Sequence, residues 1–288
     1  MGSVSDVGRQ QARRVLDAVG LRVRRVQPGS WLVGRGGDDV DQVADAVGLV
    51  LGDQPPVRVQ RQLGTRLAEH EIQTVLARTG ANVVLDVGAN RGQFAGALRA
   101  RGYTGRIVSF EPIPEHLAVL RRRSADDPDW MVLPYAAGDA DGSAEINEVP
   151  GTMSSLLNAS DFGRGWSQRL GRATVRSIEV RRIEGLLEQA LAGVSDPRVF
   201  LKLDTQGYDL IAFRGVGEAV KSLVGLVSEV SCVPIYDGMP RLVEQVAEYE
   251  AAGFELAGMY PVTIHQPTLR VIEFDAVMVR AEAVHPTH

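Results

Sequence analysis

The chain of 288 residues contains a single cysteine, Cys232, and this scarcity excludes a disulfide framework and a thiolate metal cage. No stretch approaches the ~18 consecutive apolar residues of a membrane-spanning helix, and the first residues lack the apolar core of a secretion signal. A basic excess is also missing, because the net charge is −5, whereas a nucleic-acid surface normally carries positive charge. These absences predict a cytoplasmic protein with no membrane span and no nucleic-acid partner.

Two common phosphate-binding motifs are absent from the glycine-containing turn at 83–92, which reads Val-Val-Leu-Asp-Val-Gly-Ala-Asn-Arg-Gly. A dinucleotide fingerprint needs glycine at its first, third and sixth positions, but after Gly88 these positions hold Asn90 and Gln93. A P-loop needs Gly-Lys-Ser/Thr, and Gly92 is followed by glutamine. The turn is therefore typical of neither motif.

The same segment still has the order of strand, glycine turn and helix that opens a nucleotide-binding βαβ unit. Asp86 lies inside the strand end, where a carboxylate would repel a pyrophosphate but would accept a cationic amino acid group. Glu111 closes the next predicted strand, close to the ~20-residue offset at which an acidic residue reaches ribose hydroxyls. Together these features predict S-adenosylmethionine as the ligand.

From residue 79 to 281, strand and helix patterns alternate, which predicts an α/β domain with a seven-stranded doubly wound sheet of Rossmann-like type. The strands are expected near 83–87, 106–110, 130–134, 199–204, 224–230, 254–260 and 273–280. The helices are expected near 92–101, 114–124, 182–192, 208–222 and 240–252.

An insertion at 135–181 separates the third and fourth strands of this sheet. It contains Asp141-Gly142, a hairpin signal. It also contains a further strand whose core-facing side is expected to hold Val175, Ile178 and Val180.

The sequence pattern predicts a mainly helical extension at residues 1–78 and a polar tail at residues 282–288. Apolar residues recur at helical spacing near 10–21, 43–51 and 63–78, and Gly80 is expected to end the last helix. The extension carries no recognisable chemistry. We interpret it as a cover for one edge of the domain or as the contact of a homodimer.

A second group of chemistry-bearing residues closes two neighbouring strands. Asp204 ends the strand predicted at 199–204, and Glu229 ends the next. Adjacent strands lie about 4.8 Å apart, so the two carboxylates should converge at the carboxyl edge of the sheet, where ligands bind. They could hold Mg²⁺ that binds substrate hydroxyls, act without metal as a base or hydrogen-bond acceptor, or be structural, as a helix cap and an ion-pair partner.

Three further residues are candidates with two interpretations each. Lys202 lies two positions before Asp204 and could bind a substrate oxygen or extend to a carboxylate. His265, in the loop expected between the last two strands, could be the base or an ordinary surface residue. Tyr236 could line the substrate pocket or be buried with its hydroxyl satisfied.

Taken together, these segments resemble the FkbM-type methyltransferases. The resemblance covers residues from about 80 to 280 and leaves residues 1–75 outside. Its motifs, in chain order, are Asp86-Val-Gly-Ala-Asn-Arg-Gly-Gln93, Phe110-Glu-Pro112, Ala136-Ala-Gly-Asp139, Ser154-Ser155-Leu156, Leu201-Lys-Leu-Asp-Thr-Gln-Gly-Tyr-Asp209, Glu229 and Glu273-Phe-Asp-Ala-Val-Met-Val-Arg280.

The resemblance implies a class I methyltransferase sheet of order 3-2-1-4-5-7-6 with strand 7 antiparallel. It implies that Glu111 holds the ribose and Asp139 or its neighbours the adenine of S-adenosylmethionine. It assigns the cofactor's methionine part and outer edge to Asp86, Gly88, Asn90, Gly92, Gln93, Ser154 and Ser155. The family often has Val-Glu where Thr205-Gln206 stands, so Gln206 removes an acidic group from this position.

The resemblance also implies O-methylation of a hydroxyl group on a sugar or on a polyketide-type natural product. Among small-molecule and oligosaccharide acceptors we favour a saccharide, such as a sugar of a polysaccharide, oligosaccharide or glycolipid, over a polyketide or macrolide, because the converging carboxylates suit a diol, with Mg²⁺ as a candidate second cofactor. A nucleic-acid methyltransferase is disfavoured by the net charge of −5. A non-catalytic cofactor-binding subunit is the alternative outside the enzymes.

Overall fold

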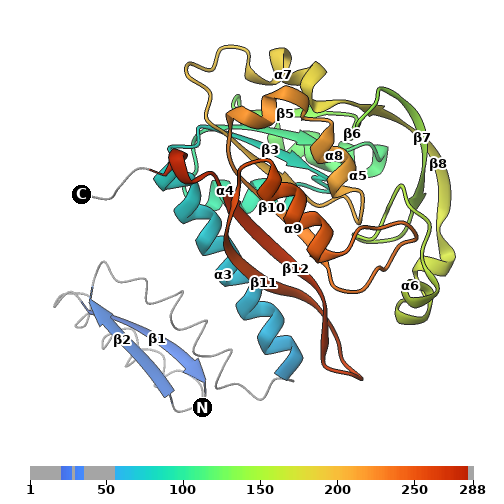
Figure 1. Ribbon diagram of the computed structural model, residues 1–288. Helices are drawn as coiled ribbons and strands as arrows, with labels where there is room; N and C mark the ends of the chain where they lie inside the picture. Colours follow the sequence, from blue (N-terminus) through green and yellow to red (C-terminus); the bar gives the residue numbers. More distant parts are fainter. Residues whose placement is uncertain (1–20, 28–29, 36–55, 285–288) are drawn as a thin grey trace. The chain divides into compact units, whose positions relative to one another are not determined.

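The computed structural model describes residues 21–27, 30–35 and 56–284 (Figure 1). The chain divides into two compact units, Met1–Gly64 and Thr65–His288. The helices predicted near 10–21 and 43–51 lie outside the described residues, except for Leu21, which begins a strand.

The smaller unit contains an antiparallel pair of strands, β1 (Leu21–Gln27) and β2 (Ser30–Arg35). This pair differs from the mainly helical extension predicted for residues 1–78. The reason lies in the local pattern, because 21–24 reads Leu-Arg-Val-Arg and alternates apolar and polar residues with the period of a strand.

Helix α3 (Pro56–Thr79) begins seven residues before the predicted start at 63. Proline is favourable in the first turn of a helix because its missing N–H would have no partner there. Gly80 ends the helix with a left-handed φ of 62°, as predicted. The second half of α3 packs Ile72 and Leu76 against the sheet, so it belongs to the larger unit.

A seven-stranded sheet of order β11-β12-β10-β9-β3-β4-β5 forms the centre of the larger unit. Strand β12 runs antiparallel to both its neighbours, and the other pairings are parallel. The predicted order 3-2-1-4-5-7-6 with strand 7 antiparallel is confirmed. The strands are β3 (Val83–Val87), β4 (Arg106–Phe110), β5 (Trp130–Leu133), β9 (Val199–Leu203), β10 (Leu223–Ser231), β11 (Glu255–His265) and β12 (Arg270–Val279).

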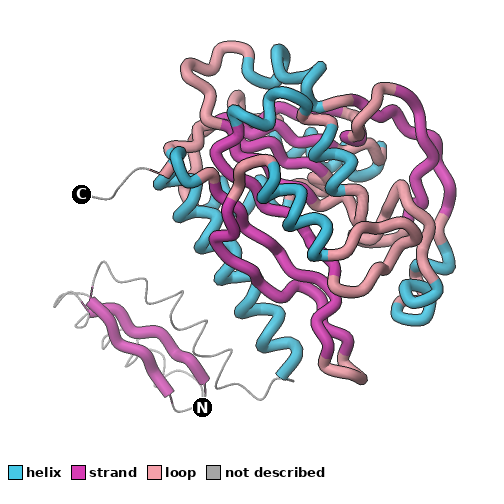
Figure 2. Tube along the Cα trace, in the orientation of Figure 1, coloured by secondary structure: helices cyan, strands magenta, loops and turns pink. Residues whose placement is uncertain are grey.

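Helices cover both faces of this sheet (Figure 2). On one face, α3, α4 (Gln93–Ala100) and α5 (Pro114–Ser124) share a core with the sheet. On the other face, α7 (Ile183–Leu191), α8 (Asp209–Arg214) and α9 (Leu242–Ala251) do the same. None of the helices in the described part of the chain is long and apolar enough to cross a membrane.

The helix predicted at 208–222 is divided into α8 and the 3-10 helix η2 (Gly217–Ser222). Gly215 lies against the backbone, since a Cβ there would be 2.0 Å from the Gly138 oxygen. Gly217 then adopts a φ of 61°, which ends the α-helical path. A further 3-10 turn, η3 (Ala281–Ala283), follows β12.

The insertion at 135–181 forms a separate three-stranded sheet of order β6-β8-β7. Its elements are β6 (Ala136–Ala137), β7 (Gly142–Glu148), α6 (Asp161–Trp166), the 3-10 helix η1 (Leu170–Arg172) and β8 (Thr174–Arg181). The hairpin predicted at Asp141-Gly142 is wrong, because β6 and β7 pair with opposite edges of β8. Val175 is 58% exposed, so only Ile178 and Val180 of the predicted apolar side are buried.

Candidate active site

The glycine turn after β3 is built for close backbone contact. Gly88 has a φ of 74°, and a Cβ there would lie 2.0 Å from the main-chain oxygen of Asp204. Gly92, the N-cap of α4, has a φ of 79°, and a Cβ there would lie 2.7 Å from Leu120 Cδ1. Side chains at either position would collide with their neighbours. The turn therefore brings the end of β3 against the end of β9 and packs the start of α4 against α5.

Glu111 stabilises this turn by accepting hydrogen bonds from the main chain. Its Oε2 accepts a hydrogen bond of 2.8 Å from the Asn90 N–H, and its Oε1 accepts one of 2.8 Å from the Ile113 N–H. The residue is only 4% exposed. Each carboxylate oxygen has a second lone pair, which could accept a hydrogen bond from a ribose hydroxyl. The ribose contact itself stays a prediction.

The side chains of Asn90 and Gln93 close the turn. The Arg91 N–H donates to Asn90 Oδ1 at 2.9 Å and to Gln93 Oε1 at 3.0 Å. Asn90 Nδ2 in turn donates to the Gly151 oxygen at 3.3 Å, which ties the turn to the insertion. The structure thus gives both side chains a role in shaping the turn, and the cofactor contacts predicted for them remain untested.

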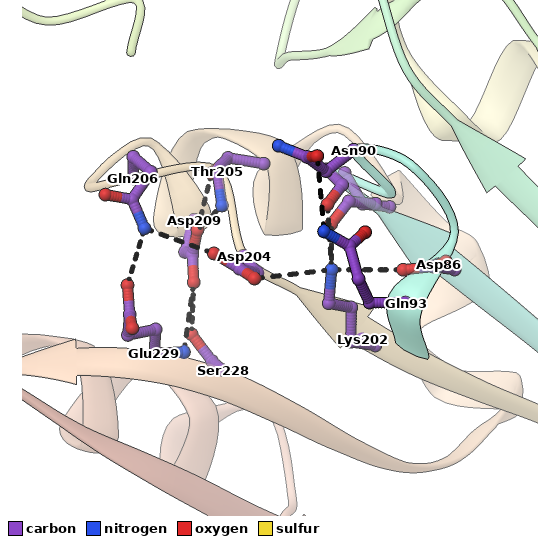
Figure 3. Close-up of polar contacts among 12 residues, drawn as sticks. Asp86, Asn90, Gln93, Lys202, Asp204, Thr205, Gln206, Asp209, Ser228 and Glu229 are labelled. Atoms are coloured by element: carbon purple, nitrogen blue, oxygen red, sulfur yellow. Dashed lines mark hydrogen bonds and ion pairs between the residues drawn. The ribbon is translucent and has the colours of Figure 1, made fainter. Parts of the chain in front are cut away.

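Asp86 and Lys202 form a buried ion pair under the turn (Figure 3). Lys202 Nζ lies 3.0 Å from Asp86 Oδ1 and 3.6 Å from Asp204 Oδ2. It also donates to the main-chain oxygens of Val87 and Gly88, at 3.2 and 2.9 Å. Burial opposes the charge of Lys202, but the Asp86 and Asp204 carboxylates outweigh it and raise the pKa of the ammonium group.

The other oxygen of Asp86 belongs to a buried polar chain. Ser109 Oγ donates to Asp86 Oδ2 at 3.2 Å, and Trp130 Nε1 donates to Ser109 Oγ at 3.0 Å. Asp86 has no exposed surface. Of the two interpretations of Lys202, its geometry matches the one in which it extends to a carboxylate. Its alternative role, a contact with the substrate, remains untested.

Asp204 and Glu229 converge at the carboxyl edge, as their strands predict. Both carboxylates accept from the same amide nitrogen, Gln206 Nε2, at 3.3 Å for Asp204 Oδ1 and 2.9 Å for Glu229 Oε2 (Figure 3). Asp204 keeps a side chain that is 45% exposed. Gln206 was noted in the sequence only as a departure from the family, and its place two residues after Asp204 was the available signal.

Asp209 supports the pair from the first turn of α8, and the sequence analysis missed this role. Its Oδ1 accepts from the Thr205 N–H at 2.7 Å. Its Oδ2 accepts from Ser228 Oγ at 2.8 Å and from the Glu229 N–H at 3.2 Å. Burial raises the pKa of Asp209. Asp209 thus joins the turn after β9 to the end of β10, and an acidic residue that opens a helix was the signal for it.

Two further carboxylates from β12 join this edge. Asp275 pairs directly with Glu229, and Glu273 pairs with Ser231, so all three acidic side chains share one face of the sheet. Burial, reinforced by the neighbouring negative charges, raises the pKa of Asp275 to about 7 and that of Glu273 to about 7. For the same reasons the pKa of Glu229 lies well above its usual range. The alternation Glu-Phe-Asp on the last strand was the signal for these residues.

The arrangement of donors between Asp204 and Glu229 does not match a Mg²⁺ site. An amide nitrogen, and not an oxygen, faces both carboxylates, whereas Mg²⁺ takes oxygen ligands. Within the described ranges, no three His, Cys, Asp or Glu side chains are grouped as metal ligands. The Mg²⁺ role predicted for the two carboxylates stays a prediction.

The serines of the insertion have their hydroxyls engaged within the protein. Ser155 is 1% exposed, and its Oγ donates to the Gln206 main-chain oxygen at 2.7 Å. Ser154 Oγ accepts from the Val149 N–H at 3.0 Å. The cofactor contacts that the resemblance implies for both are untested.

Tyr236 is 1% exposed, and its hydroxyl lies 3.0 Å from Gln206 Oε1 and 3.0 Å from the Met153 oxygen. This is the geometry of a buried tyrosine with a satisfied hydroxyl. Its burial raises the pKa of the hydroxyl. Its role as a substrate residue remains a prediction, but its hydroxyl already contacts the glutamine that joins Asp204 and Glu229.

His265 and Asp139 make other contacts. His265 Nδ1 lies 2.8 Å from Thr268 Oγ1 at the tip of the β11–β12 pair, and its ring packs edge-on against Phe162. Asp139 is exposed. The pKa of Tyr208, at the start of α8, is raised by the burial of the tyrosine and further by the negative charge of Asp139. Across the described residues, no hydrogen bond connects His265 with Asp204 or Glu229. The base and adenine roles of these two residues are untested.

Residues 86–280, which include both strand ends and the glycine turn, match the family described as the methyltransferase FkbM domain. The chain belongs to this family. It is an S-adenosylmethionine-dependent methyltransferase, and the resemblance stated from the motifs is confirmed. Glu111 at this turn fits the cofactor, because each of its carboxylate oxygens accepts one main-chain hydrogen bond and has a second lone pair that would accept from a ribose hydroxyl. No curated protein matches this chain.

Solved structures with a distant likeness include Aeropyrum pernix fibrillarin with natively bound S-adenosyl-L-methionine, at 13% identity and a TM-score of 0.44, covering 90% of this chain and 94% of that one. An rRNA methylase from Streptococcus thermophilus has 12% identity and a TM-score of 0.38, covering 73% and 95%. EvdMO1 has 14% identity and a TM-score of 0.38, covering 73% and 40%. The assignment rests on the family match.

Proposed function

We propose that this FkbM-family methyltransferase transfers the methyl group of S-adenosylmethionine to a hydroxyl group of a saccharide, with Glu229 as the general base. The observation that carries the proposal is the convergence of Glu229 and Asp204 on one amide nitrogen at the carboxyl edge of the sheet. Open α/β sheets bind their ligands at this edge.

Glu229 has the properties of a base for this reaction. Burial and the neighbouring carboxylates raise the pKa of its carboxyl well above the usual range. A base is most effective when its pKa lies near the working pH, because it is then deprotonated yet basic enough to accept a proton. An ordinary surface glutamate would be a much weaker base.

The acceptor class follows from the kind of polar groups at the site. Asp204 is partly exposed, and Asp275 lies beside Glu229 on the same face. An ionised carboxylate only accepts hydrogen bonds, so this edge in its ionised form suits an acceptor with several neighbouring hydroxyl donors. A saccharide carries such hydroxyls on adjacent carbons. We therefore favour a mono- or oligosaccharide over a polyketide-type acceptor.

The bound cofactor supplies an electrophilic methyl group on a sulfonium. The residues of the chain hold the acceptor hydroxyl in line with the methyl group and remove its proton. Glu229 takes this proton while the acceptor oxygen forms its bond to the methyl carbon and the sulfur keeps the electron pair. Asp204 orients the reacting hydroxyl or its neighbour. The Asp86 carboxylate is fully buried, so it does not contact the acceptor. It holds Lys202 in place through their ion pair and in this way supports the glycine turn.

Methyl-labelled S-adenosylmethionine, offered with mono- and oligosaccharides of which some are already partly methylated, tests this proposal. Each reaction is run with EDTA and with Mg²⁺. We expect label on a saccharide hydroxyl in both conditions. Label that requires Mg²⁺ would restore the metal-assisted alternative, and label only on polyketide-type acceptors would overturn the saccharide assignment. Cofactor binding without transfer to any acceptor would indicate a non-catalytic subunit.

A further inference from the structure

Gln206 occupies an unusual backbone position in the turn between β9 and α8. Its φ is 55°, in the left-handed region that residues other than glycine rarely adopt. Asparagine and glycine are the common residues in such turns. The turn alone does not favour a glutamine, so its side chain needs a separate explanation.

Four hydrogen-bond contacts of Gln206 are made within the site. Nε2 donates to Glu229 Oε2 at 2.9 Å and to Asp204 Oδ1 at 3.3 Å (Figure 3). Oε1 accepts from the Tyr236 hydroxyl at 3.0 Å, and the main-chain oxygen accepts from Ser155 Oγ at 2.7 Å. The side chain is therefore held between Tyr236, which follows β10, and the two carboxylates, while Ser155 of the insertion contacts its main chain.

The orientation of the amide follows from the chemistry of its neighbours. Ionised carboxylates accept hydrogen bonds and do not donate them, so the amide faces Asp204 and Glu229 with its nitrogen. Tyr236 has one hydroxyl proton, which it can donate to the oxygen at the other end of the amide or to the Met153 oxygen, each 3.0 Å away, and the residue is 1% exposed. Two carboxylates that lie this close repel each other unless a proton or a cation stands between them.

We propose that Gln206 is a positioning residue of the methyltransferase site. Its amide nitrogen stands between Asp204 and Glu229 in place of a bridging cation, and Tyr236 fixes its orientation. The inference rests on the proposed function, because positioning matters for catalysis only if Glu229 and Asp204 act on the acceptor. The insertion contacts Tyr236 through the Met153 oxygen and the Gln206 main chain through Ser155, so the inference predicts that a change in the insertion is transmitted to the two carboxylates.

The first test uses Gln206→Met, which keeps the length of the side chain and removes the amide. We expect kcat for methyl transfer to fall about tenfold, because two charge-assisted hydrogen bonds are lost. The Kd for S-adenosylhomocysteine should stay within about twofold, since no cofactor-turn contact is changed. Tyr236→Phe should lower kcat in the same direction by a smaller factor. Gln189→Met, on an exposed side of α7, is the matched control and should match the wild type.

The second test does not need activity. Gln206→Glu places a third carboxylate between Asp204 and Glu229 and creates the all-oxygen ligand set that Mg²⁺ prefers. Calorimetric titration of the full chain with MgCl₂ should show binding at least about tenfold tighter than for the wild type. The double variant Gln206→Glu/Asp204→Asn should lose this gain, which locates the ion.

The outcomes separate the two proposals. Unchanged kcat in both Gln206→Met and Tyr236→Phe would overturn the positioning role, as would tight Mg²⁺ binding at the wild-type pair. If Gln206→Met fails to fold, shown by a lost thermal unfolding transition, Tyr236→Phe and the magnesium titration decide. If the titration gives the expected gain but the wild type methylates no acceptor, the position of Gln206 is upheld and the proposed reaction is wrong.

Discussion

The ammonium group of Lys202 lies 3.0 Å from Asp86 Oδ1, and neither side chain is more than 8% exposed. The pair joins the central strands β3 and β9, in which Asp86 and Lys202 are directly paired. Lys202 also reaches Asp204 at 3.6 Å. One cation therefore connects the glycine turn, which is predicted to bind the cofactor, with the carboxylates proposed to bind the acceptor.

Replacing Lys202 by methionine should destabilise the protein by about 3–5 kcal/mol, because it leaves Asp86 buried without a compensating charge. Urea unfolding at neutral pH measures the effect. The other lysine of the chain, Lys221, provides a matched control. Its side chain is 77% exposed and pairs with the similarly exposed Glu218, so Lys221→Met should leave the midpoint unchanged. Equal midpoints for both variants would contradict the structural role of the pair.

Gly88→Ala should remove cofactor binding, since the new Cβ would stand 2.0 Å from the Asp204 oxygen. We expect a loss of stability of about 3 kcal/mol or more, because backbone strain and a backbone collision act together. Gly102→Ala separates the two effects, because Gly102 also has a positive φ of 88° but has nothing within 4 Å of an added Cβ. That variant should lose only about 1–2 kcal/mol and should bind the cofactor normally. Isothermal titration with S-adenosylhomocysteine and thermal melts compare the two variants.

Much of the sheet could be predicted from the sequence because its information is local. The predicted bounds of β3, β4 and α5 agree with the structure, since each is a short periodic run closed by a glycine, proline or polar turn. The glycine turn was predicted for the same reason. The convergence of Asp204 and Glu229 required only the rule that parallel strands end at one edge.

The contacts that the sequence did not reveal depend on long-range pairing. The three-stranded sheet of the insertion is set by β8, which pairs with both earlier strands. Gln206 joins Glu229 and Tyr236 across stretches of chain that show no shared pattern. Glu273 and Asp275 join the site only because the last strand is antiparallel, which brings its first half beside the end of β10.

Asp275→Asn should stabilise the protein at pH 8 by on the order of 1 kcal/mol. Burial raises the pKa of Asp275 to about 7, whereas the unfolded chain releases this proton near its ordinary pKa of about 4. Between these values the folded state binds more protons than the unfolded one, so stability falls as pH rises, and the loss is complete above pH 7.

Urea unfolding at pH 8 and at about pH 4.5 tests this linkage. The gain of the Asn variant should be present at the higher pH and almost absent at the lower one, where folded Asp275 is already protonated. A gain that is equal at both pH values would show that the carboxyl of Asp275 does not titrate differently in the folded protein.

The central claim is that Glu229 removes the acceptor proton. Single-turnover methyl transfer to a saccharide, in EDTA and with saturating cofactor, tests it most directly when the wild type and Glu229→Gln are compared across pH. We predict that the wild-type rate rises with pH through a pKa above the ordinary glutamate value, and that the variant is slower by about 10²–10⁴ with unchanged cofactor affinity. A variant that transfers the methyl group at the wild-type rate, with the same pH profile, would contradict the account.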